Sequence, residues 1–161
     1  MRAYQVFAGM APEQAERVLG ALKERVPAVY TQAVAAASAA LKARPRFLLS
    51  QPDDKRAHLV RRALSRVQAN ALAEEVLAAY FLEARRELLV EWLDAAGVAH
   101  DEGTLEADPV PPPPEKLHEA LVGFRRAEGE EAADRELLLR AFAAQSAVDW
   151  PDLDAELGGP D

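Results

Sequence analysis

Apolar residues recur every three or four positions along most of this chain, which is the spacing of one face of an α-helix. The first stripe follows Pro12, a residue that suits the first helical turn, and consists of Ala15, Val18, Leu19, Leu22 and Val26. Pro27 ends this helix, and an alanine-rich helix is expected from there to about residue 43. The segment 44–49 is expected to be a connector with an apolar plug. Asp53 and Asp54 then offer N-cap carboxylates for a helix that reaches about Val67.

The longest amphipathic pattern predicts one helix from about residue 70 to residue 96, followed by Gly97 as its C-cap. Its apolar stripe consists of Leu77, Phe81, Ala84, Leu88 and Trp92, widened by Leu82, Leu89 and Leu93. Because so broad a face contacts more than one neighbour, we expect this helix to be central. The stripe of Leu59, Ala63 and Val67 is in phase with that of the long helix, so one continuous helix over residues 53–96 is an alternative. A break near residues 66–71 is favoured, because Asn70 falls on the shared stripe.

The rest of the pattern predicts a loop and two further helices. Residues 101–114 begin acidic and run into four consecutive prolines, which form a stiff spacer. Helices are expected to begin at Pro114 and after Gly129. The predicted fold is all-α, a compact bundle of five or six helices in a single domain. Its parts are a helical body (10–103), a Pro-rich acidic loop (104–114), a C-terminal helical hairpin docked on the body (115–148) and an acidic tail (149–161) whose end, residues 158–161, is expected to be disordered.

Length and composition narrow the class of protein. The chain has 161 residues, half of them apolar, and no cysteine, which excludes disulfides and thiolate chemistry. It contains no apolar run of about 18 residues and no N-terminal apolar run followed by a cleavage site. We therefore expect a soluble cytoplasmic protein that makes no contact with a membrane.

Charge is distributed unevenly along the chain. Residues 1–69 hold twelve Lys/Arg and five Asp/Glu, a balance of +7, whereas residues 70–161 hold seven and twenty-two, a balance of −15. On the helix that begins at Asp53, a basic cluster is assigned to one face and consists of His58, Arg61, Arg62 and Arg66. Such a face is solvated or paired internally, binds a protein partner, or binds nucleic acid through its phosphates. The total charge of −8 and the lack of interleaved aromatic residues disfavour nucleic acid.

An acidic strip lies opposite the apolar stripe of the long helix and consists of Glu83, Glu87, Glu91 and Asp94. Antiparallel packing of the two charged helices, or of two copies, would bring the strip against the basic cluster. Each surface pair contributes only about 0.2–1 kcal/mol, so such pairing sets orientation and specificity more than stability. The charges therefore predict self-association or a protein partner.

Arg85 falls inside the apolar stripe, close to Leu88 and Trp92. An arginine there needs a carboxylate partner, an aromatic ring or a path to solvent. A structural ion pair or a stacking contact is the expected role, with an oligomer interface and a bound ligand anion as alternatives. The large aromatic residues Tyr80, Trp92 and Trp150 are expected to be contact surfaces.

Candidates for chemistry are few. A di-iron centre in a helical bundle needs two Glu-x-x-His motifs, and this chain has one, formed by Glu115 and His118. His100 lies beside acids in a loop, and it completes the weak candidate set for a metal. No serine lies in a Gly-x-Ser-x-Gly elbow, and there is no Gly-rich phosphate loop. An enzyme is therefore disfavoured, and no cofactor is expected.

The sequence thus predicts a small interaction or scaffold protein that self-associates through charge-polarised helix faces, as a homodimer or with another protein. One alternative is an accessory nucleic-acid-binding protein that uses the basic face around Arg61 and Arg62. A second alternative is a helical metalloprotein. The candidate partner- or anion-binding residues are His58, Arg61, Arg62, Arg66, Arg85 and Trp92.

Overall fold

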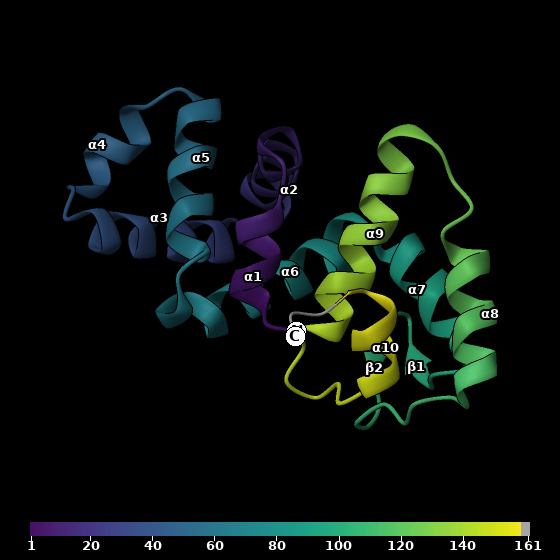
Figure 1. The fold of residues 1–161 in the computed structure, drawn as a ribbon. Coiled ribbons are helices and arrows are strands. Elements are labelled where there is room, and N and C mark those ends of the chain that lie inside the picture. Colours follow the sequence, from purple (N-terminus) through teal and green to yellow (C-terminus); the bar gives the residue numbers. More distant parts are fainter. Residues whose placement is uncertain (159–161) are drawn as a thin grey trace. The chain divides into compact units, whose positions relative to one another are not determined.

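The computed structural model describes residues 1–158 and shows an all-α protein with one very short hairpin (Figure 1). Residues 159–161, which belong to the segment expected to be disordered, lie outside the described residues. Over residues 1–158 the chain forms about ten α-helices rather than five or six, and eight of them have seven or more residues. The number is higher because prolines repeatedly start new helices, at Pro12, Pro27, Pro45, Pro114 and Pro151. None of the described helices is long and apolar enough to cross a bilayer.

The chain divides into two units, and the N-terminal unit comprises Arg2–Ala84. Its elements are α1 (Ala3–Gly9), α2 (Pro12–Arg25), α3 (Pro27–Leu41), α4 (Pro45–Ser50), α5 (Asp53–Leu64), a 3₁₀ turn η1 (Val67–Ala69) and α6 (Asn70–Ala84). Helix α5 packs on α2 and α3, and α6 packs on α1, α2 and α3. The α2 and α3 helices and the break near residues 66–71 confirm the sequence prediction, whereas α1 and α4 are additional.

The buried face of α5 differs from the predicted one. Leu59 is only half-buried, and Val67 lies beyond the helix in η1 with 65% of its surface exposed. Because α5 packs on both α2 and α3, its buried face is rotated by about one residue position from the predicted stripe. The buried residues of α5 are Arg56, Ala57, Val60, Ala63 and Leu64. This rotation also changes which of the basic residues reach solvent.

The predicted continuous helix from 70 to 96 is wrong. Helix α6 ends at Ala84, and α7 (Arg86–Ala95) begins after Arg85, whose backbone has φ −134 and ψ 41 and is not helical. A helix end leaves carbonyl oxygens without intrahelical donors, and Arg25 Nη1 donates to the carbonyl oxygen of Glu83 at 3.3 Å. The unit boundary falls at this break.

The C-terminal unit comprises Met1 and the chain from Arg85 onward. After α7 come β1 (His100–Asp101), β2 (Thr104–Leu105), α8 (Pro114–Phe124), α9 (Gly129–Ala143) and α10 (Pro151–Glu156). Helix α7 packs on α8 and α9, and α8 packs on α10. The expected helices after Pro114 and Gly129 are confirmed, but the expected loop from residue 101 contains an antiparallel hairpin. Its turn residues, Glu102 and Gly103, both have positive φ, as a type I′ turn requires.

An aromatic cluster forms the centre of the C-terminal unit. Trp92 lies 5.5 Å from Phe124 and 5.9 Å from Phe142, and Phe142 lies 5.2 Å from Trp150, measured between ring centroids. Both tryptophans are buried, as is Tyr80 in the N-terminal unit. The expectation that these aromatic residues form contact surfaces is therefore wrong, because their apolar area is used in the two cores. The expectation of a single domain stays a prediction.

Candidate functional site

The predicted basic cluster on α5 is partly used inside the N-terminal unit. Arg61 Nη1 donates to the carbonyl oxygen of Met10, and Arg66 Nη1 donates to that of Ala40 at 3.0 Å. These arginines satisfy main-chain acceptors at the ends of α1 and α3, which is a structural role. His58, Arg62 and Arg66 are exposed, and Arg61 is half-buried. Binding of a partner or an anion by these four residues stays a prediction.

Arg56, which sequence reasoning missed, is the buried arginine of this region. Its Nε donates to the hydroxyl of Tyr30 at 2.6 Å, and its Nη1 donates to the carbonyl oxygens of Leu49 at 2.9 Å and Gln51 at 3.2 Å. Its Nη2 pairs with the carboxylate of Asp53. A guanidinium has five donors in a fixed fork, so this one side chain holds the turn between α4 and α5 against α3. The spacing of Asp53 and Arg56, three positions apart on a helix, is the one signal in the sequence for it.

Helix α4 presents two large apolar side chains to solvent. Leu48 is fully buried and is the apolar plug, whereas Phe47 is 54% exposed and Leu49 is 57% exposed. The helix is one short turn at the edge of its unit, beside α3 and α5 in Figure 1. Ser50 Oγ donates to the carbonyl oxygen of Phe47 at 2.7 Å, which closes the turn. Only one of the three consecutive apolar residues can point inward from so short a helix.

Four cations lie within six residues of these apolar side chains in the sequence, and one of them, Lys55, lines a hollow together with Phe47. Within the part of the chain that the structure describes, Lys42, Arg44, Arg46 and Lys55 are exposed and make no ion pair or side-chain hydrogen bond. We call this surface the cationic corner, and it consists of Lys42, Arg44, Arg46, Phe47, Leu49 and Lys55. Lys42 caps α3 in the left-handed region, with φ 52 and ψ 36, a conformation that glycine adopts at lower cost.

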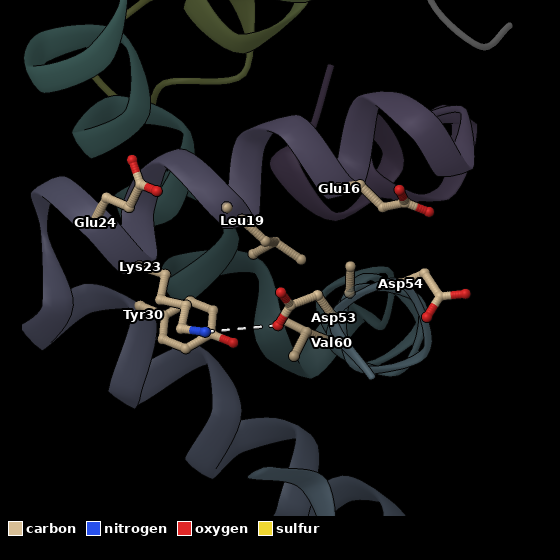
Figure 2. A pocket seen from close by; sticks show the side chains of 10 residues that line it. Glu16, Leu19, Lys23, Glu24, Tyr30, Asp53, Asp54 and Val60 are labelled. Carbon is tan, nitrogen blue, oxygen red and sulfur yellow. Dashed lines mark ion pairs between the residues drawn. The ribbon is translucent and has the colours of Figure 1, made fainter. Parts of the chain in front are cut away.

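Two hollows lie beside α5. The first, of about 420 Å³, lies between α2, the start of α3 and the first turns of α5, and Figure 2 shows its lining. Leu19, Tyr30 and Val60 supply apolar surface, and Lys23 Nζ lies 3.5 Å from Asp53 Oδ1. The second hollow, of about 500 Å³, lies between α2, α4 and α5, and Phe47 and Lys55 of the cationic corner form part of its wall. The second hollow and the cationic corner therefore share two residues and adjoin each other.

The acidic strip is paired within the protein rather than with α5. Glu87 Oε1 lies 2.9 Å from Arg85 Nε, and Asp94 Oδ1 lies 2.8 Å from His100 Nε2. Glu91 pairs with Arg135 of α9. These three carboxylates thus use basic groups of their own unit, and the fourth, Glu83, belongs to α6 in the other unit. Within one chain these three carboxylates do not pair with the basic cluster, whereas the expected pairing between two copies stays a prediction.

Arg135 is the buried cation of the C-terminal unit and was not identifiable as a site from its sequence position. Its guanidinium donates to Glu91 Oε1 and Oε2, to Glu131 Oε1, and to the carbonyl oxygen of Phe124 at 2.9 Å. The carbon Cζ also lies 4.8 Å from the centre of the Phe124 ring. The hydrogen bond with Glu91 raises the pKa of Arg135 above its ordinary value, and burial lowers it by less. The group therefore stays charged and acts as a structural tie.

Arg85 forms the structural ion pair that was the expected role for it. Besides Glu87, it pairs through Nη1 with the buried carboxylate of Asp134 on α9. Trp92 is fully buried, and within residues 1–158 its indole N–H has no hydrogen-bond partner. Trp92 therefore offers no surface for a partner, whereas Arg85 is partly exposed and takes part in a structural ion pair.

Two of the weak metal candidates, His100 and His118, each pair with a carboxylate. His100 Nδ1 accepts a hydrogen bond from the Gly103 N–H at 3.1 Å, so the proton on Nε2 faces Asp94. His118 Nδ1 lies 3.0 Å from Glu156 Oε1, and Glu115 is exposed. Over the described residues, no group of three or more His, Cys, Asp or Glu side chains is placed to hold a metal ion.

Comparisons with protein families, with curated protein sequences and with solved structures found no match to this chain. The functional argument therefore rests on the geometry of the cationic corner.

Proposed function

We propose that this protein is a small protein-interaction protein that self-associates through the cationic corner. The observation that carries the proposal is the exposure of Phe47 and Leu49 close to the four cations of the corner. Within the described residues, these cations make no ion pair. Exposed apolar side chains rimmed by charged ones are typical of protein contact sites. Such a site needs an acidic partner surface with apolar groups of its own.

The charge of the second unit supports a copy of this chain as that partner. Residues 2–84 hold twelve Lys/Arg and eight Asp/Glu, a balance of +4. Residues 85–161 hold seven and nineteen, a balance of −12. Opposite charge on two parts of one chain steers two copies into contact and suppresses contact between like parts. Contact between unlike parts of two copies is therefore favoured.

Arg56 supports the proposal because it gives the corner a fixed shape. A contact surface binds more tightly when its side chains are held in the bound arrangement beforehand. The guanidinium ties the carbonyl oxygens of Leu49 and Gln51 to Tyr30, so the exposed side chains of α4 project from a fixed turn. Arg56 is thus a positioning residue for the corner.

Sedimentation velocity at several protein concentrations tests the proposal. We expect the wild type to self-associate at low salt and to dissociate as salt screens the cations. The double variant Phe47→Ser, Leu49→Ser is expected to weaken association at least about tenfold, since about 1.4 kcal/mol corresponds to that factor. Val67→Ser is the matched control, because Val67 is an exposed apolar residue of the same unit outside the corner. A wild type that stays monomeric at all concentrations and salts contradicts the proposal.

Nucleic-acid binding is the second candidate function, and one observation favours it. The exposed ring of Phe47 lies next to the unpaired Arg46, so the surface has the aromatic platform and the cation that single-stranded nucleic acid uses. Binding of a labelled oligothymidylate, measured by fluorescence anisotropy, tests it. Loss of that binding in Phe47→Ser, with retention in Val67→Ser, would favour this candidate over self-association.

A further inference from the structure

The Pro-rich loop of the C-terminal unit carries an exposed apolar side chain beside exposed acids. We call residues 106–113 the proline strap. Val110 is 81% exposed, and Glu106 and Asp108 are exposed four and two residues before it. The strap thus combines apolar surface with the charge opposite to that of the cationic corner.

Residues 106–108 of the strap form a bend, and the part from Pro109 to Pro113 is anchored at both ends. Pro109 is buried, and its carbonyl oxygen accepts a hydrogen bond from Trp150 Nε1 at 2.8 Å. At the other end Pro114 begins α8, and Pro113 before it has φ −54 and ψ 146, close to polyproline II. A segment that is already extended and fixed loses little conformational entropy when it binds. The part of the strap from Pro109 to Pro113 is therefore presented in a preformed conformation.

The second hollow of the N-terminal unit has the features that such a ligand needs. Pro12, Phe47 and Leu59 supply apolar surface that suits Val110. Lys55 and His58 also line the hollow, as do the carboxylates of Glu16 and Asp54, so the acids of the strap are placed outside it, at the cations of the corner. Extended proline-rich segments dock in grooves lined by aromatic side chains, where prolines and aliphatic groups fill the apolar part. Phe47 is the aromatic residue here, and its position is fixed by the turn that Arg56 holds.

We propose that the proline strap of one copy docks in this hollow of a second copy. Val110 packs against Phe47, and the carboxylates of Glu106 and Asp108 lie among the cations of the corner. Asp108, at the end of the bend, comes two residues before Val110, so a carboxylate stays close to the apolar side chain. Because Lys55 belongs to both the hollow and the corner, one strap reaches apolar and cationic partners together. This inference rests on the proposed function and names the surface that the corner binds.

Complementation between two full-length variants tests the docking. The strap variant carries Glu106→Gln, Asp108→Asn and Val110→Ser, and the corner variant carries Phe47→Ser and Leu49→Ser. Each variant alone lacks one of the two surfaces, so each is expected to be monomeric where the wild type associates. An equimolar mixture is expected to regain association, because one intact strap and one intact corner remain. Val122→Ser is the control for the strap variant, since Val122 is an exposed apolar residue of α8 in the same unit.

The outcomes separate this inference from the proposed function. If the corner variant is monomeric but the strap variant associates like the wild type, the strap is not the occupant and the proposed function stands. If each variant is monomeric and their mixture also stays monomeric, an intact strap and an intact corner do not bind each other, and the inference is overturned. If the wild type itself never associates and the corner binds an oligonucleotide or an anionic vesicle instead, both fail. Far-ultraviolet circular dichroism of each variant establishes that it is folded.

Discussion

The guanidinium of Arg135 donates two hydrogen bonds to the carboxylate of Glu91, 44 residues earlier in the chain, at 2.6 and 2.9 Å. This bidentate pair joins α9 to α7 across the C-terminal unit, and Phe124 of α8 lies against the same guanidinium. Bidentate charge-assisted pairs are stronger and more directional than single ones. One arginine thus ties three helices together.

Replacement of Arg135 by alanine is expected to destabilise the C-terminal unit by about 3 kcal/mol, because it removes a buried, hydrogen-bonded charge and the packing on Phe124. Both tryptophans of the chain lie in this unit, so urea denaturation followed by tryptophan fluorescence measures its free energy of unfolding. A double-mutant cycle with Glu91→Gln is expected to give a coupling of about 1 kcal/mol. Glu119→Gln, at an exposed carboxylate of α8, is the control, and an equal effect there would contradict the assignment.

Arg56→Lys is expected to destabilise the N-terminal unit by about 2 kcal/mol, because an ammonium cannot reach the hydroxyl of Tyr30 and two carbonyl oxygens at once. All three tyrosines of the chain lie in this unit, so tyrosine absorbance follows its unfolding. Amide hydrogen exchange over residues 45–51 is expected to become faster than in the rest of the unit. Arg62→Lys, on the exposed side of the same helix, should leave both measurements unchanged; a similar loss there would show that Arg56 has no special role.

Trp150→Phe keeps the aromatic packing on Phe142 but removes the N–H that binds the carbonyl oxygen of Pro109. We expect a loss of about 1 kcal/mol in the stability of the C-terminal unit. The strap is also expected to be cut faster by proteases that cleave in residues 104–108, since its anchored end is released. Limited proteolysis with mass spectrometry measures the rate of cutting. Unchanged cutting would mean that the hydrogen bond does not hold the strap.

The sequence allowed most helices to be predicted because prolines and glycines mark their ends. Pro12, Pro27, Pro114 and Gly129 each start a helix at the expected place. The break at Arg85 could not be predicted in the same way, because the apolar stripe continues past it from α6 into α7. Arg85, at the break, pairs with Asp134, a partner 49 residues away that local periodicity does not reveal.

The candidate site was predictable only in part, for a similar reason. The excess of positive charge between Lys42 and Arg66 is visible in the sequence, and the cationic corner lies within that range. Which cations stay available depends on main-chain acceptors, because Arg61 and Arg66 bind carbonyl oxygens of distant helix ends. The exposure of Phe47 and Leu49 depends on a six-residue helix, and a run of three apolar residues does not predict such a helix.

At Lys42, thermal stability and self-association favour different residues, because its backbone is left-handed. A non-glycine residue in that conformation costs about 1 kcal/mol, so Lys42→Gly is expected to raise the melting temperature of the N-terminal unit by about 4 °C. The same change removes one of the four unpaired cations of the corner and is expected to weaken self-association. A selection for thermal tolerance alone is therefore expected to enrich glycine at residue 42, and a selection for self-association is expected to enrich lysine. Enrichment of the same residue under both selections would contradict a conflict between the two properties at this position.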